Sequence, residues 1–234
     1  MIHPVIAKII HLLPEWFVTY ASKKLVDRYL NKYANIHVSG AEHLEKMRTP
    51  TLFVCNHLSN ADGLVLNRVL RLADPTFVAG VKLSENSVTN IGMNVVKTTH
   101  IVPDSADHEG LKKIIRLVKS GENILIFPEG TRSRTGSMIK AKKGILLIAR
   151  MTGAPIVPIG IYGSEQLLPI NHEGDMSGEV FHHASVHVHI GEQFNLTKKD
   201  KDQDKKTYEE MATKNIMERI ARLLPTEYQG VYAK

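Results

Sequence analysis

Short apolar runs that alternate with stretches of helical spacing are the feature that most restricts how this 234-residue chain can fold. The runs have the length of buried strands and lie at residues 36–38, 51–55, 76–79, 101–102, 123–127, 156–161 and 186–190. Helical spacing occupies residues 62–72, 85–95, 108–119, 141–152 and 206–224. This alternation predicts an α/β fold, in which a mixed, largely parallel sheet is flanked by helices.

The first 33 residues differ from the rest and predict an N-terminal amphipathic helical hairpin. Apolar residues recur at helical spacing over residues 2–13, and Pro14 suits the first turn of a second helix. That helix begins with Trp16 and Phe17 and continues through several basic residues, a pattern typical of a hairpin in a bilayer interface. A helix packed on the protein's own core is the alternative. We therefore expect two parts: membrane-associating helices at 1–33 and a globular domain at 34–234.

The membrane contact is expected to be peripheral or monotopic. No stretch reaches the ~18 uninterrupted apolar residues that a spanning helix needs. Lys8, His11 and Glu15 interrupt the apolar head, which argues against a signal peptide. The mixed-charge run at 197–206 predicts a solvated linker or helix start.

Charge and cysteine content narrow the choice of partners and compartment. A net charge of +6 favours anionic partners such as anionic lipid, phosphorylated metabolites or nucleic acid, although surface lysines that serve solubility would give the same charge. The single cysteine, Cys55, excludes an intrachain disulfide. Neither of the common nucleotide-binding glycine motifs is present, and no aromatic–basic pattern is typical of a nucleic-acid module. We therefore expect no nucleic-acid partner.

A first polar loop follows the apolar run at 51–55 and contains a possible general base. His57 and Asp62 are separated by four residues. Histidine titrates near neutrality, and a carboxylate on one ring nitrogen makes the other nitrogen a better base. We expect His57 to take a proton from a substrate hydroxyl, with Asp62 orienting the imidazole. Alone, the pair is a weak signal, since His and Asp often fall near each other by accident.

No obvious side-chain nucleophile accompanies this pair. The Gly-x-Ser-x-Gly elbow is missing. Cys55 could form a Cys–His dyad, but a lone cysteine at the end of an apolar strand is usually a small buried hydrophobe. Ser59 is more typical of a turn or cap. A base acting directly on an acceptor hydroxyl fits best, which means single-step transfer without an acyl-enzyme.

A second polar loop, residues 127–134, follows another apolar run and suits an anion. Arg132 offers a planar fork of donors for phosphate oxygens, and Arg134 can join it. Glu129 could brace the arginines or bond a substrate hydroxyl, and Gly130 permits a tight turn. Both loops can line one crevice, because open α/β sheets bind ligands beyond the carboxyl ends of their strands. A surface turn with ordinary salt bridges is the alternative.

Four histidines near the end of the sheet region raise the question of a metal: His182, His183, His187 and His189. The last two alternate with valines, so they should share one face of a strand. Zinc would require further ligands at defined spacing, and none is evident. We expect an exposed strand face and no metal site.

Taken together, the loops resemble those of the glycerolipid acyltransferases, the 1-acylglycerol-3-phosphate acyltransferases and their relatives. The segment from Asn56 to Asp62 is similar to that family's first motif, Phe127–Ser133 to its third, and Ala154–Ile159 to its fourth. The resemblance spans residues 35 to 195. The second motif departs from the family pattern: Lys82 is present, but the strand at 100–105 lacks the usual arginine.

The resemblance implies transfer of a fatty acyl group from acyl-CoA or acyl-ACP to 1-acylglycerol-3-phosphate, giving phosphatidic acid. It implies no bound cofactor and no metal. The implied partners are lysophosphatidic acid, an anionic bilayer surface and acyl carrier protein, with the enzyme on the cytoplasmic face of the membrane. The implied phosphate-binding residues are Lys82, Glu129, Gly130, Thr131, Arg132 and Arg134, and the implied acyl-site residues are Val157 and Pro158.

The missing arginine leaves the acceptor open. Glycerol-3-phosphate, another lysophospholipid or a glycolipid are alternatives within the family. A thioester hydrolase and a non-catalytic membrane-binding protein are alternatives outside the transfer reaction.

Overall fold

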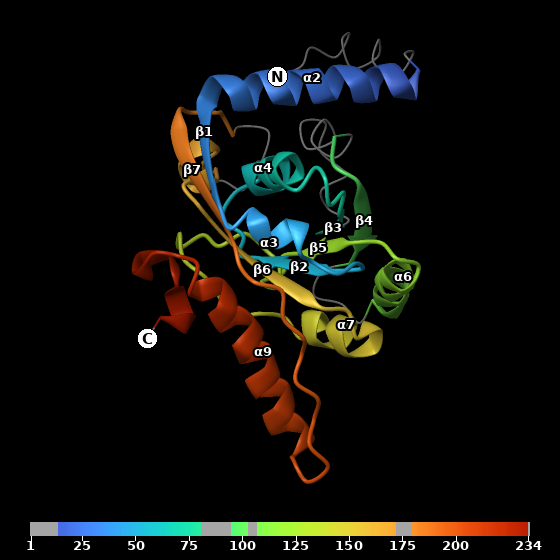
Figure 1. The fold of residues 1–234 in the computed structure, drawn as a ribbon. Helices are drawn as coiled ribbons and strands as arrows, with labels where there is room; N and C mark the ends of the chain where they lie inside the picture. The colour runs from blue at the N-terminus through green and yellow to red at the C-terminus, as the bar shows by residue number, and fades with distance from the viewer. Residues whose placement is uncertain (1–13, 81–94, 103–106, 172–178, 234) are drawn as a thin grey trace.

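The computed structural model describes residues 14–80, 95–102, 107–171 and 179–233, and its centre is a seven-stranded sheet within these ranges (Figure 1). The strand order is β1-β7-β6-β2-β5-β3-β4. The strands are β1 Ala34–Ser39, β2 Leu52–Cys55, β3 Thr76–Gly80, β4 Thr98–Ile101, β5 Ile124–Ile126, β6 Ile156–Tyr162 and β7 Ala184–Ile190. The predicted mixed, largely parallel α/β sheet is confirmed.

The sheet consists of two sets of parallel strands, and the two sets run in opposite directions. β6, β2, β5, β3 and β4 run parallel to one another, and β1 runs parallel to β7. The two sets meet at the antiparallel pair β6 and β7, where Tyr162 lies opposite His187. The N-terminal ends of β1 and β7 therefore lie on the same side of the sheet as the C-terminal ends of β2, β5 and β6.

The described helices are α2 Glu15–Tyr33, α3 Glu42–Glu45, α4 Ala61–Val69, α6 His108–Lys119, α7 Gly144–Thr152, α8 Ser164–Leu167 and α9 Lys205–Ala221, with short 3₁₀ turns η3 Thr226–Tyr228 and η4 Gly230–Tyr232. The helices lie within a few residues of the predicted ranges, except for α3 and α8, two short helices that the sequence did not predict. Two predicted helices, at 2–13 and over most of 85–95, lie outside the described residues, so the hairpin as a whole is not tested.

Two predicted boundaries were wrong. The strand predicted at 101–102 begins earlier, at Thr98, because polar residues in β4 hide it from a search for apolar runs. The helix predicted at 62–72 ends at Val69, and Asp74 then takes a positive φ of 40° ahead of Pro75.

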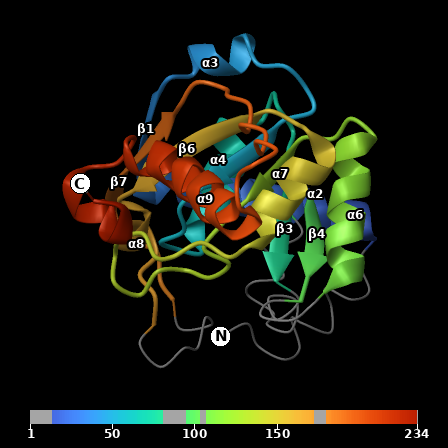
Figure 2. The same cartoon turned by 90° about the horizontal axis from the view of Figure 1, so that it is seen from below.

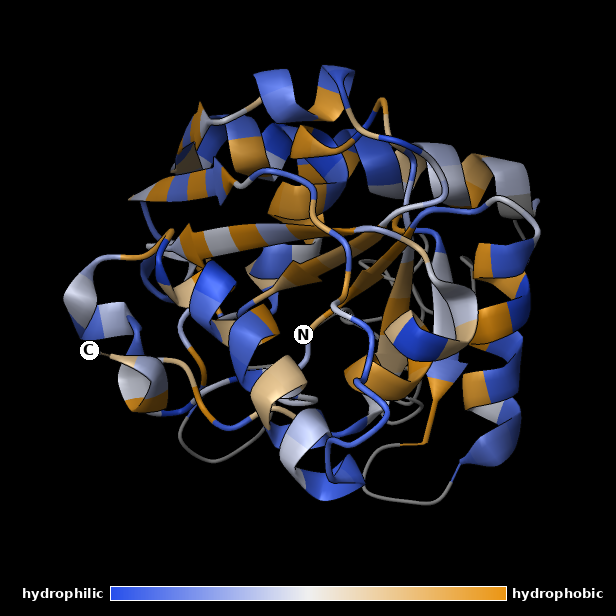
Figure 3. Ribbon diagram, turned by 60° about the horizontal axis from the view of Figure 1, so that its bottom comes forward, coloured by the Kyte–Doolittle hydropathy of each residue, from blue (hydrophilic) through white to orange (hydrophobic). Residues whose placement is uncertain are grey.

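Two apolar layers cover the two faces of the sheet, and side-chain alternation along each strand supplies both. In β2, Phe53 and Cys55 join the layer under α4 and α8, whereas Leu52 and Val54 join the layer under α6, α7 and α9. Figure 2 shows α6, α7 and α9 over the second face, and Figure 3 shows apolar residues concentrated on the central strands. All four β2 side chains are buried, so this strand is held rigidly from both sides.

Helix α2 lies on the same side of the molecule as α4 and runs directly into β1 (Figure 1). Its Leu30 is buried in the layer under α4. Towards its other end, Trp16 is 71% exposed and Tyr20 is 56% exposed. In the part of the chain that the structure describes, no helix combines the length and apolar character needed to cross a bilayer.

Candidate active site

The two polar loops meet at the carboxyl ends of neighbouring parallel strands. β2 leads into the first loop and β5 into the second, and these strands pair through Leu52 and Ile124. The backbone N–H of Ser133 donates to the carbonyl of His57 at 2.8 Å. A backbone bond between the loops leaves little freedom in their spacing, so they form one site as expected from the sheet topology.

His57 and Asp62 form a close pair. His57 Nδ1 lies 2.7 Å from Asp62 Oδ2, and the same oxygen accepts the backbone N–H groups of Leu58 and Ser59. Asp62 is fully buried, whereas the His57 side chain is 18% exposed. Because a carboxylate can only accept here, the proton on the imidazole lies on Nδ1, and the lone pair of Nε2 is left without this partner.

The ring of His57 is also fixed from the side. It stacks on Phe127, with 4.0 Å between ring centroids and 15° between ring planes. Phe127 follows β5 directly, so the aromatic support comes from the second loop. The imidazole is therefore held by a hydrogen bond at one nitrogen and by a stacked ring across its face.

Glu129 does not brace the arginines as expected. Its side chain is completely buried, Oε1 accepts the backbone N–H of His57 at 2.9 Å, and Oε2 accepts that of Ile139 at 2.8 Å. Burial raises the pKa of Glu129 to about 7, against the opposing effect of these two hydrogen bonds. Glu129 therefore positions the backbone of His57 and joins it to residue 139, and its burial leaves no oxygen exposed to a substrate hydroxyl.

The carboxylate that pairs with Arg132 is Glu179, which the sequence analysis missed. Arg132 Nη1 donates to Glu179 Oε1 at 2.7 Å, and Asn60 Nδ2 donates to Glu179 Oε2 at 2.7 Å. Asn60 lies between His57 and Asp62, so Glu179 connects both loops. No motif marks Glu179, since it lies 47 residues from Arg132 in an irregular segment before β7.

The remaining predicted phosphate-binding residues have fewer contacts. Gly130 adopts a φ of +70°, which favours glycine, and a Cβ there would lie 3.0 Å from Cγ of Lys142. Thr131 and Arg134 are exposed, and Arg134 has no ion-pair partner in the described ranges. Lys82 lies outside the described residues.

The two alternative nucleophiles occupy structural positions. Cys55 is fully buried, and burial, with smaller contributions from Asp62 and Glu129, holds the pKa of its thiol well above the usual range. A thiol in that state is a poor source of thiolate. Ser59 Oγ donates to the carbonyl of Leu168 and accepts from the N–H of Ala61, as expected of a turn residue.

Asn56, Val157 and Pro158 belong to the scaffold under the loops. Asn56 exchanges two hydrogen bonds of 2.8 Å with the backbone of Ile161, which extends the pairing of β2 with β6 beyond Cys55. Val157 and Pro158 are buried in β6 opposite Phe53 and Val54. Their predicted part in an acyl site stays a prediction.

The histidines of β7 form a ring stack. His187 and His189 share one face of the strand, and His187 stacks on Tyr162 at 4.6 Å and on His37 at 4.7 Å between ring centroids. Burial, with the neighbouring His37 and His189, lowers the pKa of His187. Among the described residues, no group of three or more His, Cys, Asp or Glu side chains is arranged to hold a metal ion.

Comparison with known proteins gives consistent matches. The model of the Acyltransferase family matches residues 35–162. A chloroplastic 1-acyl-sn-glycerol-3-phosphate acyltransferase of Arabidopsis thaliana is 30% identical over 171 residues, which cover 72% of this chain and 46% of the relative. One from Brassica napus is 33% identical over 156 residues, covering 65% of this chain and 43% of the relative. The chain thus spans about half the length of the curated relatives it matches.

A solved structure is similar over most of the chain. It is the 1-acyl-sn-glycerophosphate acyltransferase PlsC of Thermotoga maritima, with a TM-score of 0.60 and 26% sequence identity. The match covers 87% of this chain and 80% of that one. The matched family region contains β2 to β6, both polar loops and all of β1 except its first residue. The chain therefore belongs to the acyltransferase family.

Proposed function

We propose that this protein transfers a fatty acyl group from a thioester to the free hydroxyl of 1-acylglycerol-3-phosphate, giving phosphatidic acid. The observation that carries the proposal is that the His57–Asp62 pair, whose carboxylate is buried, shares one site with an arginine fork, and that neither nearby candidate nucleophile is available. The names of the relatives from Arabidopsis thaliana and Thermotoga maritima support the same acceptor.

His57 acts as the general base. Nε2 takes the proton of the acceptor hydroxyl as the oxygen attacks the thioester carbonyl, and Asp62 stabilises the imidazolium that forms. The imidazolium of His57 then gives this proton to the thiolate leaving group, which restores the neutral base. The acyl carbon passes directly from sulfur to oxygen, since Cys55 is buried and Ser59 Oγ already donates to a carbonyl.

Arg132 holds the acceptor phosphate. Its side chain is 17% exposed, and partial withdrawal from water strengthens hydrogen bonds to an anion. With the base at one end and the arginine at the other, the acceptor hydroxyl is presented to His57 in a fixed orientation.

Most N–H groups of the first loop are already engaged, so the oxyanion of the intermediate needs other hydrogen-bond donors. The N–H groups of His57, Leu58 and Ser59 already donate to the carboxylates of Glu129 and Asp62. Among the described residues, the N–H groups of Thr131 and Arg132 in the second loop donate to no acceptor. These two groups are our candidates for oxyanion stabilisation.

The exposed side of α2 serves as a peripheral membrane contact. Trp16, Phe17 and Tyr20 are exposed large apolar side chains at one end of the helix. A groove of about 1310 Å³ between α2 and α4 adds basic residues that suit anionic lipid: Lys23, Lys24, Arg28, Lys32 and Arg71. The triple substitution of Trp16, Phe17 and Tyr20 by serine should weaken sedimentation with anionic vesicles, and undiminished binding would refute this contact.

The decisive experiment is an assay of purified protein that crosses acyl donors with acceptors. Acyl-CoA and acyl-ACP are each offered with 1-acylglycerol-3-phosphate, glycerol-3-phosphate, another lysophospholipid and no acceptor. The expected product is phosphatidic acid, identified by mass spectrometry. Free fatty acid without acylated lipid would instead establish a thioester hydrolase, and acylation of another acceptor alone would move the substrate within the family.

A further inference from the structure

Glu179 bridges the two loops of the candidate site. Each of its carboxylate oxygens has its own partner at 2.7 Å, Arg132 in the second loop and Asn60 in the first. The Glu179 side chain is only 3% exposed. Withdrawing a carboxylate from water is costly unless both oxygens are satisfied, so this arrangement holds the carboxylate and the guanidinium together.

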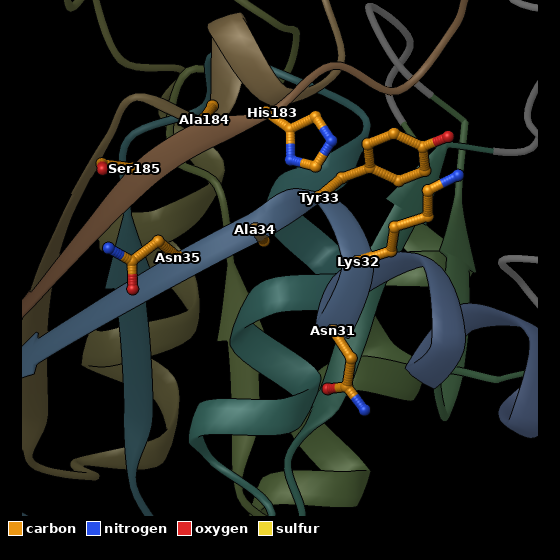
Figure 4. Close-up of a pocket in the computed structure, with 8 residues that line it drawn as sticks. All are labelled: Asn31, Lys32, Tyr33, Ala34, Asn35, His183, Ala184 and Ser185. Atoms are coloured by element: carbon orange, nitrogen blue, oxygen red, sulfur yellow. The ribbon is translucent and has the colours of Figure 1, made fainter.

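The segment that contains Glu179 is itself anchored before β7 begins. Phe181 packs against Tyr33, with 6.2 Å between ring centroids, and Tyr33 also contacts His183 at 4.9 Å. Figure 4 shows the rings of Tyr33 and His183 side by side at a hollow of about 490 Å³ where α2 joins β1. The backbone N–H of His182 donates to the carbonyl of Leu167, the last residue of α8, at 2.8 Å. Glu179 is therefore held by its backbone surroundings as well as by its two partners.

The ion pair uses only one edge of the Arg132 guanidinium. A guanidinium has five N–H donors in one plane. Nη1 donates to Glu179, while Nε and Nη2 have no acceptor in the described part of the chain. Holding one amino group in place limits how the plane can turn, which narrows the directions in which the unused donors can point.

We propose that Glu179 is a positioning residue for the acceptor phosphate. It keeps the free edge of Arg132 directed towards the phosphate, and through Asn60 it fixes that phosphate site relative to His57. The proposal rests on the proposed function, because the anion in question is the phosphate of the lipid acceptor. Since Glu179 offsets the charge of Arg132, the site depends on directed hydrogen bonds more than on net positive charge.

The test compares three variants with the wild type. Glu179→Ala should raise the KM for 1-acylglycerol-3-phosphate about tenfold, with kcat changed by less than about threefold, because a freed arginine binds phosphate less well. Glu179→Gln keeps an oxygen that can accept from Arg132, so its KM should rise less. The matched control is Glu209→Ala, which removes another Glu–Arg pair, 3.3 Å from Arg150 and between α9 and α7. This control should leave both constants unchanged.

Two further measurements separate positioning from a merely structural role. The double variant Glu179→Ala with Arg132→Ala should be no worse than Arg132→Ala alone, since the effect of Glu179 acts through Arg132. Asn60→Ala should raise KM in the same direction by a smaller factor. Asn60 is at the N-cap position of α4 but makes no side-chain cap, so its loss removes mainly the bond to Glu179.

Binding of inorganic phosphate, measured by calorimetry without an acyl donor, tests the anion site independently of turnover. Glu179→Ala should weaken it about tenfold. A lower KM or tighter phosphate binding in Glu179→Ala would identify Glu179 as a competing counter-ion and overturn the proposal, as would unchanged values. If the wild type fails to acylate 1-acylglycerol-3-phosphate, the proposed function fails, and the phosphate titration still decides whether Glu179 positions Arg132.

Discussion

The two ends of the candidate site are built in different ways. At the proton-transfer end, His57 is five residues from its carboxylate, and Asp62 also accepts two N–H groups from the same turn. At the anion-binding end, Arg132 depends on Glu179, 47 residues away, and Glu179 depends on Asn60, 119 residues away. Local contacts thus form the proposed base, whereas the proposed anion site is assembled only when distant segments come together.

The two ends also differ in the burial of their side chains. Asp62 and Glu129 are completely withdrawn from water and support His57 from the side chain and from the backbone. Arg132 keeps donors free for a ligand. We therefore expect changes at the first end to affect kcat and changes at the second end to affect acceptor binding.

The largest effect should follow from His57→Ala. Loss of the base should lower kcat for acyl transfer by at least about 100-fold, since positioned general bases contribute about 10²- to 10⁴-fold. Steady-state assays with a saturating acyl donor measure this. His108→Ala, on the exposed start of α6, is the control. Unchanged turnover in His57→Ala would defeat the mechanism.

Arg132→Ala should instead change the KM for the acceptor more than it changes kcat. We expect a rise of about 10- to 100-fold in the KM for the acceptor with a smaller change in kcat, because charge-assisted hydrogen bonds to phosphate are lost. Arg132→Lys retains the charge without the planar fork and should fall between wild type and alanine. An effect confined to the thioester donor would contradict the phosphate role.

Glu129 should make stability depend on pH in an identifiable direction. Its pKa is raised from 4.5 to about 7 in the folded protein, so the folded state binds more protons than the unfolded state between these values. The contribution of this group to the free energy of unfolding therefore becomes less favourable as pH rises from about 4.5 to 7, by about 3 kcal/mol.

Urea unfolding of the wild type and of Glu129→Gln at several pH values between 5 and 8 tests this dependence. The variant loses one acceptor for a backbone N–H, which lowers its stability at every pH. The free energy of unfolding of the wild type should nevertheless fall relative to that of Glu129→Gln as pH rises. Glu227→Gln, on an exposed turn, is the control, and a constant difference for Glu129→Gln would contradict the raised pKa.

The smallest effect on activity should come from Cys55→Ser. A buried hydroxyl lowers stability by about 1–3 kcal/mol, but the proton-transfer end needs no thiol. The rate per folded molecule should stay within about threefold of the wild type, with melting temperature measured in parallel. Complete loss of activity in a folded variant would restore the Cys–His dyad as an alternative.

Most of the fold could be read from the sequence because its signals are local. Short buried strands such as β2 and β5 are continuous apolar runs, and α6 has a clear apolar face with Ile114 and Val118 buried. β4 was placed too late because Thr98, Thr99 and His100 are polar. Strand direction was less accessible, since no local pattern specifies that β7 runs antiparallel to β6.

By itself, the sequence determined the α/β class and the pairing of His57 with Asp62. Side-chain periodicity and a five-residue spacing are local properties that survive without knowledge of the fold. Tertiary structure alone decided that Glu129 supports the backbone of His57 and that Glu179 holds Arg132. The physical reason is that β7 runs antiparallel to β6. This direction brings the segment before β7 to the side of the sheet where the C-terminal ends of β2 and β5 lie.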